Sequence, residues 1–442
     1  MPQWRFEPRP IVLGTPAAPV HDAAPPAATT LVVSHVLPYP PRAGNEYRIH
    51  RLVRWLRSAG HEVHLVVCPL PGELLDPALV AGAAQEYANL VVCERDGVLR
   101  YRCERPEARA AIVALAGDRP ATFPAARDPR IGERIARIEE TFCPDPLLDV
   151  LVRLSDAIEP DVIVSSYVFM SRSLALLRRD ALKVIDTHDV FSSKGRKVVQ
   201  FGVADDLALS PDEERAMLRR ADLVIAIQPD EERELRDLAP DRRVVTAGVD
   251  FELAGSSATA TNPVVLCVAS SNAMNVRGMR DFISLAWPLV RQEVPGARLQ
   301  VVGPVCDAVA PGIEGVELLG RVDRLDDAYA RARVVINPAL AGTGLKIKTL
   351  EALSHLRPIV VWPSGVDGLG PEARRLCHVS RDWFDFGRQV VRLLSTAASE
   401  EVEQHRDELA RMLSADSVYG ALRAALEERP AATARARRGI GR

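Results

Sequence analysis

The chain has 442 residues, of which 47% are hydrophobic and 26% charged, a composition typical of a globular protein but too long for one ordinary hydrophobic core. Its formal net charge of −3 disfavours a dedicated nucleic-acid-binding protein, and no apolar run reaches the ~18 residues of a membrane span. The seven cysteines include no CxxC pair, which disfavours a zinc site or a disulfide framework and favours reduced thiols in a cytoplasmic protein.

Both ends of the chain differ in composition from the rest. Residues 1–28 are rich in Pro and Ala and lack the continuous apolar core of a signal peptide, so we expect a mostly disordered extension. The tail after Glu428 carries five arginines and no acid. This tail is a candidate for peripheral contact with the anionic inner face of a membrane, although a solvated, frayed terminus is the favoured interpretation.

Strands and helices alternate from residue 29. The apolar run at Thr30–Ser34 predicts a buried strand, followed by a helix over Glu46–Ser58 and a strand over His61–Cys68. Residues 70–145 are less regular, and we expect helices, loops and an acceptor-side insertion there. Four helix and strand pairs follow: helices Leu147–Ile158, Ser171–Arg179, Ser210–Arg220 and Pro229–Leu238, and strands Asp161–Ser165, Lys183–Asp186, Leu223–Ile227 and Arg243–Thr246.

A linker of small and polar residues over 248–261 separates a second α/β series from the first. Its expected strands are Val264–Ala269, Arg298–Val302, Val316–Leu318, Arg333–Asn337 and Ile359–Trp362, and its expected helices are Arg280–Glu293, Leu325–Ala332, Ile347–Ser354, 383–395 and 400–428. The pattern predicts an α/β fold of two Rossmann-like domains with parallel sheets and a ligand cleft between them. We place these domains at 29–255 and 262–412, with a C-terminal helix and basic tail at 413–442.

The segment 334–361 reads as buried strand, Gly-rich turn, helix and buried strand. Gly342 and Gly344 would let a ligand approach the backbone, and the helix start after them offers unpaired amides and a positive dipole end for phosphate. Lys346 and Lys348 add charge there, and Glu351, one turn further, could accept hydrogen bonds from ribose hydroxyls. Neither the GxxxxGK[ST] nor the GxGxxG pattern is satisfied.

Simpler interpretations compete with a phosphate site. The glycines could be turn residues, the lysines a solvated face, and Glu351 an exposed residue without a partner. However, a lysine at a helix N-terminus costs about 0.3–1 kcal/mol unless an anion is present, which favours a ligand.

The residues GTGLKIKTLEALSHLRPIVV resemble the donor-binding segment of glycosyltransferase family 4, whose enzymes have the GT-B fold. Residues 38–67, 221–238, 264–290 and 315–338 are also similar to that family's pattern. The resemblance implies an N-terminal acceptor domain and a C-terminal donor domain, with the lysines on the diphosphate and Glu351 on the ribose. The donor-binding residues that it implies are Asn275, Arg277, Gly342, Thr343, Gly344, Leu345 and Glu351.

The sequence departs from the family pattern at two places. Thr343 stands eight positions before Glu351, where many relatives have a second glutamate. Ser270 and Ser271 stand where an arginine usually follows the first strand of the donor domain. We therefore expect Lys346 or Lys348 to carry most of the charge opposite the diphosphate.

Two loops of the N-terminal domain carry further candidates. His188 follows the strand that ends at Asp186, and resembling enzymes place a histidine near the donor sugar here. Asp189 could orient His188, contact the acceptor or cap a helix, and His35 is a weaker candidate. Gly44 and Asn45 lie in a loop that approaches the diphosphate or the acceptor in relatives, or they simply form a turn and a helix cap. His50, His61 and His64 are expected at packing or surface positions.

The resemblance implies transfer of a sugar from a nucleotide diphosphate to an acceptor hydroxyl, with His188, Lys346 and Lys348 in catalytic roles. We expect retention of anomeric configuration, no metal ion and no cofactor, in polysaccharide, glycolipid or glycoconjugate synthesis in the cytoplasm. A nucleotide-sugar epimerase and a catalytically degenerate nucleotide-sugar-binding subunit are the alternatives. A dehydrogenase is disfavoured because no dinucleotide fingerprint is present.

Overall fold

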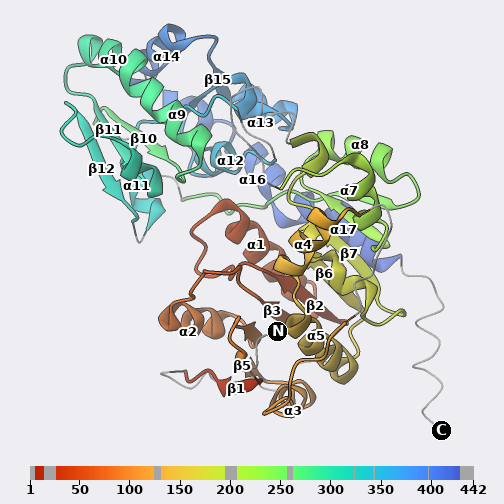
Figure 1. The fold of residues 1–442 in the computed structure, drawn as a ribbon. Coiled ribbons are helices and arrows are strands. Elements are labelled where there is room, and N and C mark those ends of the chain that lie inside the picture. Colours follow the sequence, from red (N-terminus) through yellow and green to blue (C-terminus); the bar gives the residue numbers. More distant parts are fainter. Residues whose placement is uncertain are drawn as a thin grey trace. The chain divides into compact units, whose positions relative to one another are not determined.

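The computed structural model describes residues 5–13, 26–123, 131–194, 207–255, 262–322, 324–341, 344–396 and 398–428. They divide into two compact units, shown in Figure 1. The described residues of the first unit lie before residue 195, at 207–247 and at 421–428, and those of the second unit lie between 248 and 420. The last helix, α17 (Ala415–Glu427), thus begins in the second unit and ends in the first.

The first unit contains one sheet, in which nine strands can be followed among the described residues in the order β1-β5-β4-β3-β2-β6-β7-β8-β9. Neighbouring strands are parallel, except that β4 and β5 pair antiparallel. The strands are β1 (Glu7–Pro10), β2 (Ala28–Ser34), β3 (His61–Val67), β4 (Asn89–Cys93), β5 (Val98–Cys103), β6 (Val162–Ser166), β7 (Leu182–Asp186), β8 (Leu223–Ala226) and β9 (Arg243–Thr246).

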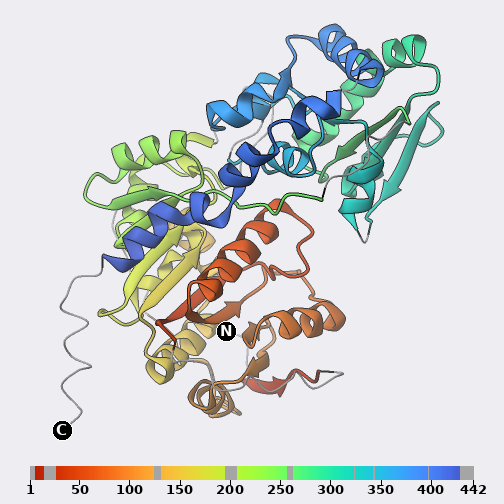
Figure 2. The ribbon, with the colours of Figure 1, turned by 180° about the vertical axis from the view of Figure 1, so that it is seen from behind.

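Helices cover both faces of this sheet. Successive residues of β2 point to opposite faces, and both sets are buried. Leu31 and Val33 join a core cluster that includes Leu147 and Leu151, whereas Val32 between them is equally buried and faces the other way. Figure 2 shows α1 in front of the strands, and Figure 1 shows α4 and α5 on the opposite side. The helices are α1 (Gly44–Ser58), α2 (Pro77–Glu86), α3 (Pro106–Val113), α4 (Glu133–Phe142), α5 (Asp145–Ile158), η1 (Val168–Ala175), α7 (Pro211–Leu218) and α8 (Pro229–Leu238).

The second unit contains a parallel sheet in the order β12-β11-β10-β13-β14-β15. Its strands are β10 (Val264–Val268), β11 (Arg298–Val302), β12 (Val316–Gly320), β13 (Val334–Asn337), β14 (Ile359–Val361) and β15 (Cys377–Val379). Its helices are α9 (Ala273–Asp281), η2 (Phe282–Ala286), α10 (Trp287–Glu293), η3 (Pro304–Ala308), α11 (Leu325–Arg331), α12 (Ile347–Ser354), η4 (Pro363–Val366), α13 (Pro371–Arg375), α14 (Trp383–Ser395), α15 (Ala398–Glu403) and α16 (Arg406–Leu413).

Each sheet reverses its strand order once. In the first sheet the chain moves outward from β2 through β3 and β4, then starts again on the other side with β6. In the second sheet β10 leads to β11 and β12, and β13 restarts on the other side of β10. Loops at the carboxyl ends of the two strands flanking such a reversal diverge to opposite faces, which is where ligands bind in open α/β sheets. The predicted α/β fold with two mainly parallel sheets is confirmed.

The extension expected to be mostly disordered over 1–28 contains a strand. Glu7–Pro10 form β1, which pairs with β5, and β2 already begins at Ala28. Prolines at residues 8 and 10 argue against a strand, because proline lacks the N–H that pairing requires. An edge strand tolerates that loss, and β1 lies at one edge of the sheet. Phe6 just before it is 2% exposed and belongs to the core of the first unit.

Four other predictions need correction. The single helix expected over 400–428 is three helices, α15, α16 and α17, separated by turns. The segment expected to form helices and loops at 70–145 also contains β5, which forms a hairpin with β4. The helix expected over Ser171–Arg179 is the 3₁₀ helix η1. The helix expected from Arg280 starts at Ala273, because the side chain of Asn272 accepts a hydrogen bond from the amide of Asn275 at 2.9 Å and caps it.

Within the described part of the chain, no helix combines the length and the apolar character needed to cross a membrane.

Replacing Phe6 by Ala should destabilise the protein, because this ring is buried beside β1. We expect a loss of about 3 kcal/mol in the free energy of unfolding, measured by urea denaturation of the full chain followed by circular dichroism. Val12→Ala is the matched control, since Val12 is 83% exposed and its truncation should change the free energy by less than about 0.5 kcal/mol. Equal stability of the two variants would contradict the packing of Phe6 and the N-terminal strand against the first unit.

Candidate functional site

Lys346 stabilises the end of the loop between β13 and α12. Gly344 has φ of 75°, a left-handed conformation that favours glycine, and its carbonyl accepts a hydrogen bond from Nζ of Lys346 at 2.9 Å. Lys346 is buried and lies at the N-cap position of α12. The carbonyl of Leu345 accepts from the amide of Ile347 at 2.8 Å. Gly342 and Thr343, both predicted donor contacts, lie outside the described residues.

Lys348 joins the two loops that flank the reversal of the second sheet. Its Nζ donates a hydrogen bond at 2.7 Å to Oδ1 of Asn275 in α9, the helix that follows β10. Asn275 is itself buried, and its amide group donates to the carbonyl of Ser270 at 3.1 Å. Burial lowers the pKa of Lys348, although the negative charge of Glu351 acts to raise it. An ammonium group has three N–H donors, so Lys348 can bond an anion without leaving Asn275.

The close approach of α9 to the chain after β13 depends on Gly278. A Cβ atom at this position would lie 2.2 Å from the carbonyl oxygen of Pro338. The N-termini of α9 and α12 therefore meet at one edge of the sheet, where the positive ends of the helix dipoles favour negative charge. Arg277 is not drawn into this arrangement: its side chain is 59% exposed, and its nearest acidic partner is Asp281 at 3.7 Å.

Glu351 has a partner, which the sequence did not reveal. The hydroxyl of Tyr329 in α11 donates to Oε2 of Glu351 at 2.9 Å. Burial raises the pKa of Glu351 to about 7, although the Tyr329 hydrogen bond and the charge of Lys348 oppose it. The ring of Tyr329 stacks on His355, with centroids 4.2 Å apart and planes 5° apart, which fixes the direction of its hydroxyl. The carboxyl group of Glu351 is therefore fixed in place by a hydrogen bond and is not the exposed, unpartnered group that the simpler interpretation expected.

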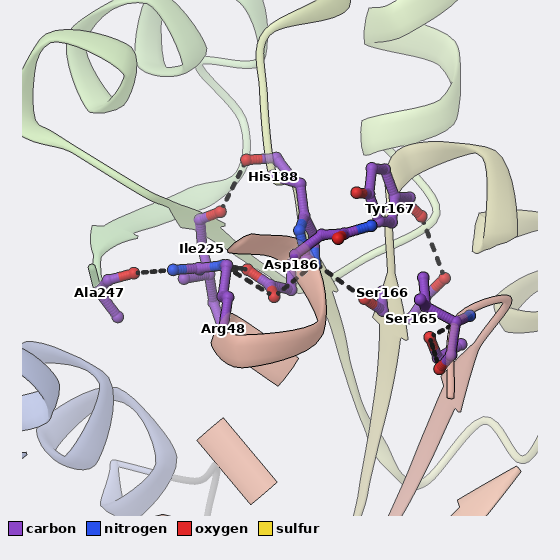
Figure 3. Close-up of polar contacts among 12 residues, drawn as sticks. Arg48, Ser165, Ser166, Tyr167, Asp186, His188, Ile225 and Ala247 are labelled. Atoms are coloured by element: carbon purple, nitrogen blue, oxygen red, sulfur yellow. Dashed lines mark hydrogen bonds and ion pairs between the residues drawn. The ribbon is translucent and has the colours of Figure 1, made fainter. Parts of the chain in front are cut away.

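His188 is enclosed by the strands that end beside it in the first unit, as Figure 3 shows. Its Nε2 lies 2.8 Å from Oγ of Ser166 and 3.1 Å from Oδ2 of Asp186. The ring of Tyr167, directly after β6, stacks on the imidazole with centroids 4.0 Å apart and planes 8° apart. Burial lowers the pKa of His188, although Asp186 acts to raise it.

Arg48 of α1 holds Asp186 in place. Its Nε lies 3.1 Å from each carboxylate oxygen, its Nη2 contacts Oδ1, and its Nη1 donates to the carbonyl of Ala247 at 2.9 Å. Both side chains are buried. Burial alone would raise the pKa of Asp186, but the charge of Arg48 and the hydrogen bonds from Arg48 and His188 outweigh it and keep this pKa well below its ordinary value.

The remaining candidates of the first unit lie around the same strand ends. Gly44 is the first residue of α1, and the side chain of Asn45 accepts from the amide of Glu46 at 3.0 Å and is hydrogen-bonded to the hydroxyl of Tyr167. Asp189 pairs with Lys194 at 3.0 Å. His35, after β2, has its ring centroid 4.7 Å from that of Tyr167, and burial lowers its pKa to about 3.

Three of the remaining histidines have structural partners. Nδ1 of His50 lies 2.8 Å from the hydroxyl of Tyr87, and Nδ1 of His61 lies 2.7 Å from Oγ1 of Thr30. His64 is buried and faces Glu62 at 3.3 Å.

Sequence reasoning missed Arg48, Asp186, Tyr167 and Tyr329 as parts of these sites. Asp186 and Tyr167 could have been found, because a polar or aromatic residue at the carboxyl end of a parallel strand lies at the ligand-binding edge. Arg48 and Tyr329 carry no such signal, since both lie within amphipathic helices. Among the described residues, no group of three or more His, Cys, Asp or Glu side chains could hold a metal ion.

Two family models match the chain and together cover more than half of it. The model "Glycosyl transferases group 1" matches residues 262–396, and the model "Glycosyl transferase 4-like domain" matches residues 43–248. No curated protein gives a significant match.

Several solved structures are similar in fold. TarM from S. aureus, solved with fondaparinux, α-GlcNAc-glycerol and UDP, has a TM-score of 0.62 at 9% identity, covering 91% of this chain and 100% of its own. HepE from Anabaena, solved with UDP and glucose, has a TM-score of 0.59 at 13% identity, with 91% and 100% covered. Sucrose-phosphate synthase from Thermosynechococcus elongatus has a TM-score of 0.53 at 16% identity, with 90% and 100% covered. These likenesses establish the GT-B fold.

Stability should depend on pH through Glu351. The pKa of Glu351 is raised to about 7 in the folded protein and returns to its ordinary value of 4.5 in the unfolded chain, so stability falls as pH rises through this window. Between about pH 5 and about pH 8, the free energy of unfolding should fall by about 1–3 kcal/mol less in Glu351→Gln than in the parent protein. Glu293→Gln, at an exposed position of α10, should behave like the parent. An unchanged pH slope in Glu351→Gln would refute the assignment.

Proposed function

We propose a specific reaction for this chain, which belongs to the glycosyltransferases of group 1 with a glycosyl transferase 4-like domain: transfer of a hexosyl group from a nucleoside diphosphate sugar to an acceptor hydroxyl. The contact between Lys348 and Asn275 carries this proposal. It puts a partly buried ammonium group where two helix N-termini meet at the reversal of a parallel sheet. Such an edge has the charge and the geometry to take a diphosphate.

The donor is assigned to the second unit. Lys348 and Lys346, with the amides at the starts of α9 and α12, would face the diphosphate and stabilise the charge that develops as the sugar leaves. With these groups supplying the positive charge, we propose a reaction that needs no metal ion. Arg277, exposed and turned toward Asp281, is assigned at most an outer role.

The ribose is assigned to Glu351. Its Oε2 is occupied by the Tyr329 hydroxyl, while Oε1 makes no hydrogen bond to a described residue, so one oxygen can accept from a ribose hydroxyl. A carboxylate accepts more strongly than a neutral acid, and donor binding should therefore favour the ionised form of Glu351.

The acceptor is assigned to the first unit, with Gly44, Asn45 and Asp189 around the ends of its strands, and His188 is proposed to keep its catalytic role toward the sugar. The chemistry is proposed to retain anomeric configuration and to serve polysaccharide, glycolipid or glycoconjugate synthesis in the cytoplasm. The basic tail at 429–442, outside the described residues, is proposed as a peripheral membrane contact. Solved neighbours hold UDP, glucose or UDP-glucose, which makes UDP-sugars the first donors to test.

The donor assignment can be tested with a thermal-shift panel of UDP-, GDP-, ADP- and TDP-sugars. A ligand at 100 times its dissociation constant should stabilise the protein by about 2.7 kcal/mol. Released nucleoside diphosphate is then measured with and without candidate acceptors. Formation of an epimer without an acceptor would support an epimerase instead, and binding without turnover or donor hydrolysis would support a degenerate subunit. A panel without any shift would contradict the assignment altogether.

Lys348→Ala should lower kcat by about a hundredfold, because it removes a preorganised charge opposite the leaving diphosphate. Lys346→Ala should act in the same direction. Lys183→Ala is the control, since Lys183 lies near the N-terminal end of β7, whereas His188 follows the carboxyl end of that strand. Near-normal turnover in both loop variants, with the control also active, would exclude the lysines from the donor site.

A further inference from the structure

The ion pair between Arg48 and Asp186 is buried without an evident structural need. Arg48 is 4% exposed and Asp186 is fully buried, and their partners come from α1 and β7, which are 138 positions apart in sequence. Removing two charges from water costs several kcal/mol per ion, so a well-packed apolar pair would serve stability at least as well. The position of this pair, directly behind His188, suggests a different role.

The ion pair decides which ring nitrogen of His188 carries the proton. Oδ2 of Asp186 lies 3.1 Å from Nε2, and the neighbouring arginine keeps the carboxylate ionised. A carboxylate facing the bare lone pair of Nε2 would be repelled, whereas an Nε2–H group donates to it. Oγ of Ser166, 2.8 Å from the same nitrogen, can accept a second branch of this bond or donate elsewhere. The remaining nitrogen, Nδ1, makes no hydrogen bond to a described residue.

The ring has little freedom to turn away from this arrangement. Tyr167 stacks on one face, and the backbone of His188 has φ of 60°, a strained conformation for a residue with a side chain. Burial disfavours the imidazolium and lowers the pKa of His188, which favours a neutral ring. A neutral ring with its proton on Nε2 presents an acceptor lone pair at Nδ1.

We propose that Asp186, clamped by Arg48, is a positioning residue that fixes His188 as the neutral Nε2–H tautomer and presents Nδ1 as a hydrogen-bond acceptor to a hydroxyl of the sugar substrate. The part of this inference that concerns the substrate rests on the function proposed above. The tautomer itself is a property of the free protein. Asp189, Arg48 and His35 are the other titratable groups that act on or beside His188, and they lie on its own loop, on α1 and after β2.

The variant Asp186→Asn should reverse the tautomer. Arg48 contacts Oδ1 through both Nη2 and Nε but Oδ2 through Nε alone, so the carbonyl oxygen of an asparagine would take the Oδ1 position. Its NH₂ group would then stand where Oδ2 is, 3.1 Å from Nε2, and would donate to this nitrogen. The ring proton would move to Nδ1, and the acceptor lone pair would be lost from the side that meets the substrate.

Nitrogen-15 NMR of histidine-labelled full-length protein tests this directly, with His188→Gln used to assign the signal. We expect the Nε2–H tautomer in the parent and in Ser166→Ala, and the Nδ1–H tautomer in Asp186→Asn. An Nδ1–H ring or an imidazolium in the parent near neutral pH would overturn the proposal, as would an Nε2–H ring that persists in Asp186→Asn. The spectrum of the parent protein tests the predicted Nε2–H tautomer of His188 even if Asp186→Asn does not fold. None of these spectra depends on turnover.

Kinetics supply the second arm once a donor and an acceptor are known. Asp186→Asn should lower kcat by about 10²-fold or more while the KM for the donor stays within about twofold, because only the tautomer presented to the reacting sugar changes. Unchanged kcat together with a reversed tautomer would show that Nδ1 has no part in the reaction. A chain that binds no sugar nucleotide would refute the proposed function and leave the tautomer assignment standing.

Discussion

The arrangement of both sites depends on one constraint, which is the reversal of strand order within a parallel sheet. At such a reversal, the two central strands send their following chains to opposite faces, and a gap opens between the loops. In the first unit β2 and β6 flank this point, and in the second unit β10 and β13 do so. The stacked residues Tyr167 and His188 and the bonded residues Asn275 and Lys348 gather there because the backbone leaves space for side chains.

Burial gives these groups their chemical character. Asp186 is buried, Lys348 and Glu351 are partly buried, and each is held by a partner that compensates part of the cost: Arg48, Asn275 and Tyr329 respectively. A group held in this way keeps its direction before a substrate arrives. Little reorganisation is then needed at the moment of reaction, which is where preorganised electrostatics contribute most to rate.

Much of the architecture could be predicted from local pattern. The bounds of α8, β9, β11 and α12 agree with the sequence analysis, because each has a clear period and a capping or breaking residue at its ends. The identification of the family, from the residues around Lys346 and Glu351, is confirmed. Elements without such a pattern were lost: β1 is interrupted by prolines, and β5 alternates arginines with apolar residues in a region that otherwise looks irregular.

The sequence by itself determined the two α/β series, the helix start that carries two lysines, and the position of His188 after a strand. Only the tertiary structure decided which side chains meet. Asn275 and Lys348 are 73 positions apart and Arg48 and Asp186 are 138 apart, and no local period relates them. Strand order brings them together, since the residues that follow neighbouring parallel strands share one edge of the sheet wherever they stand in the chain.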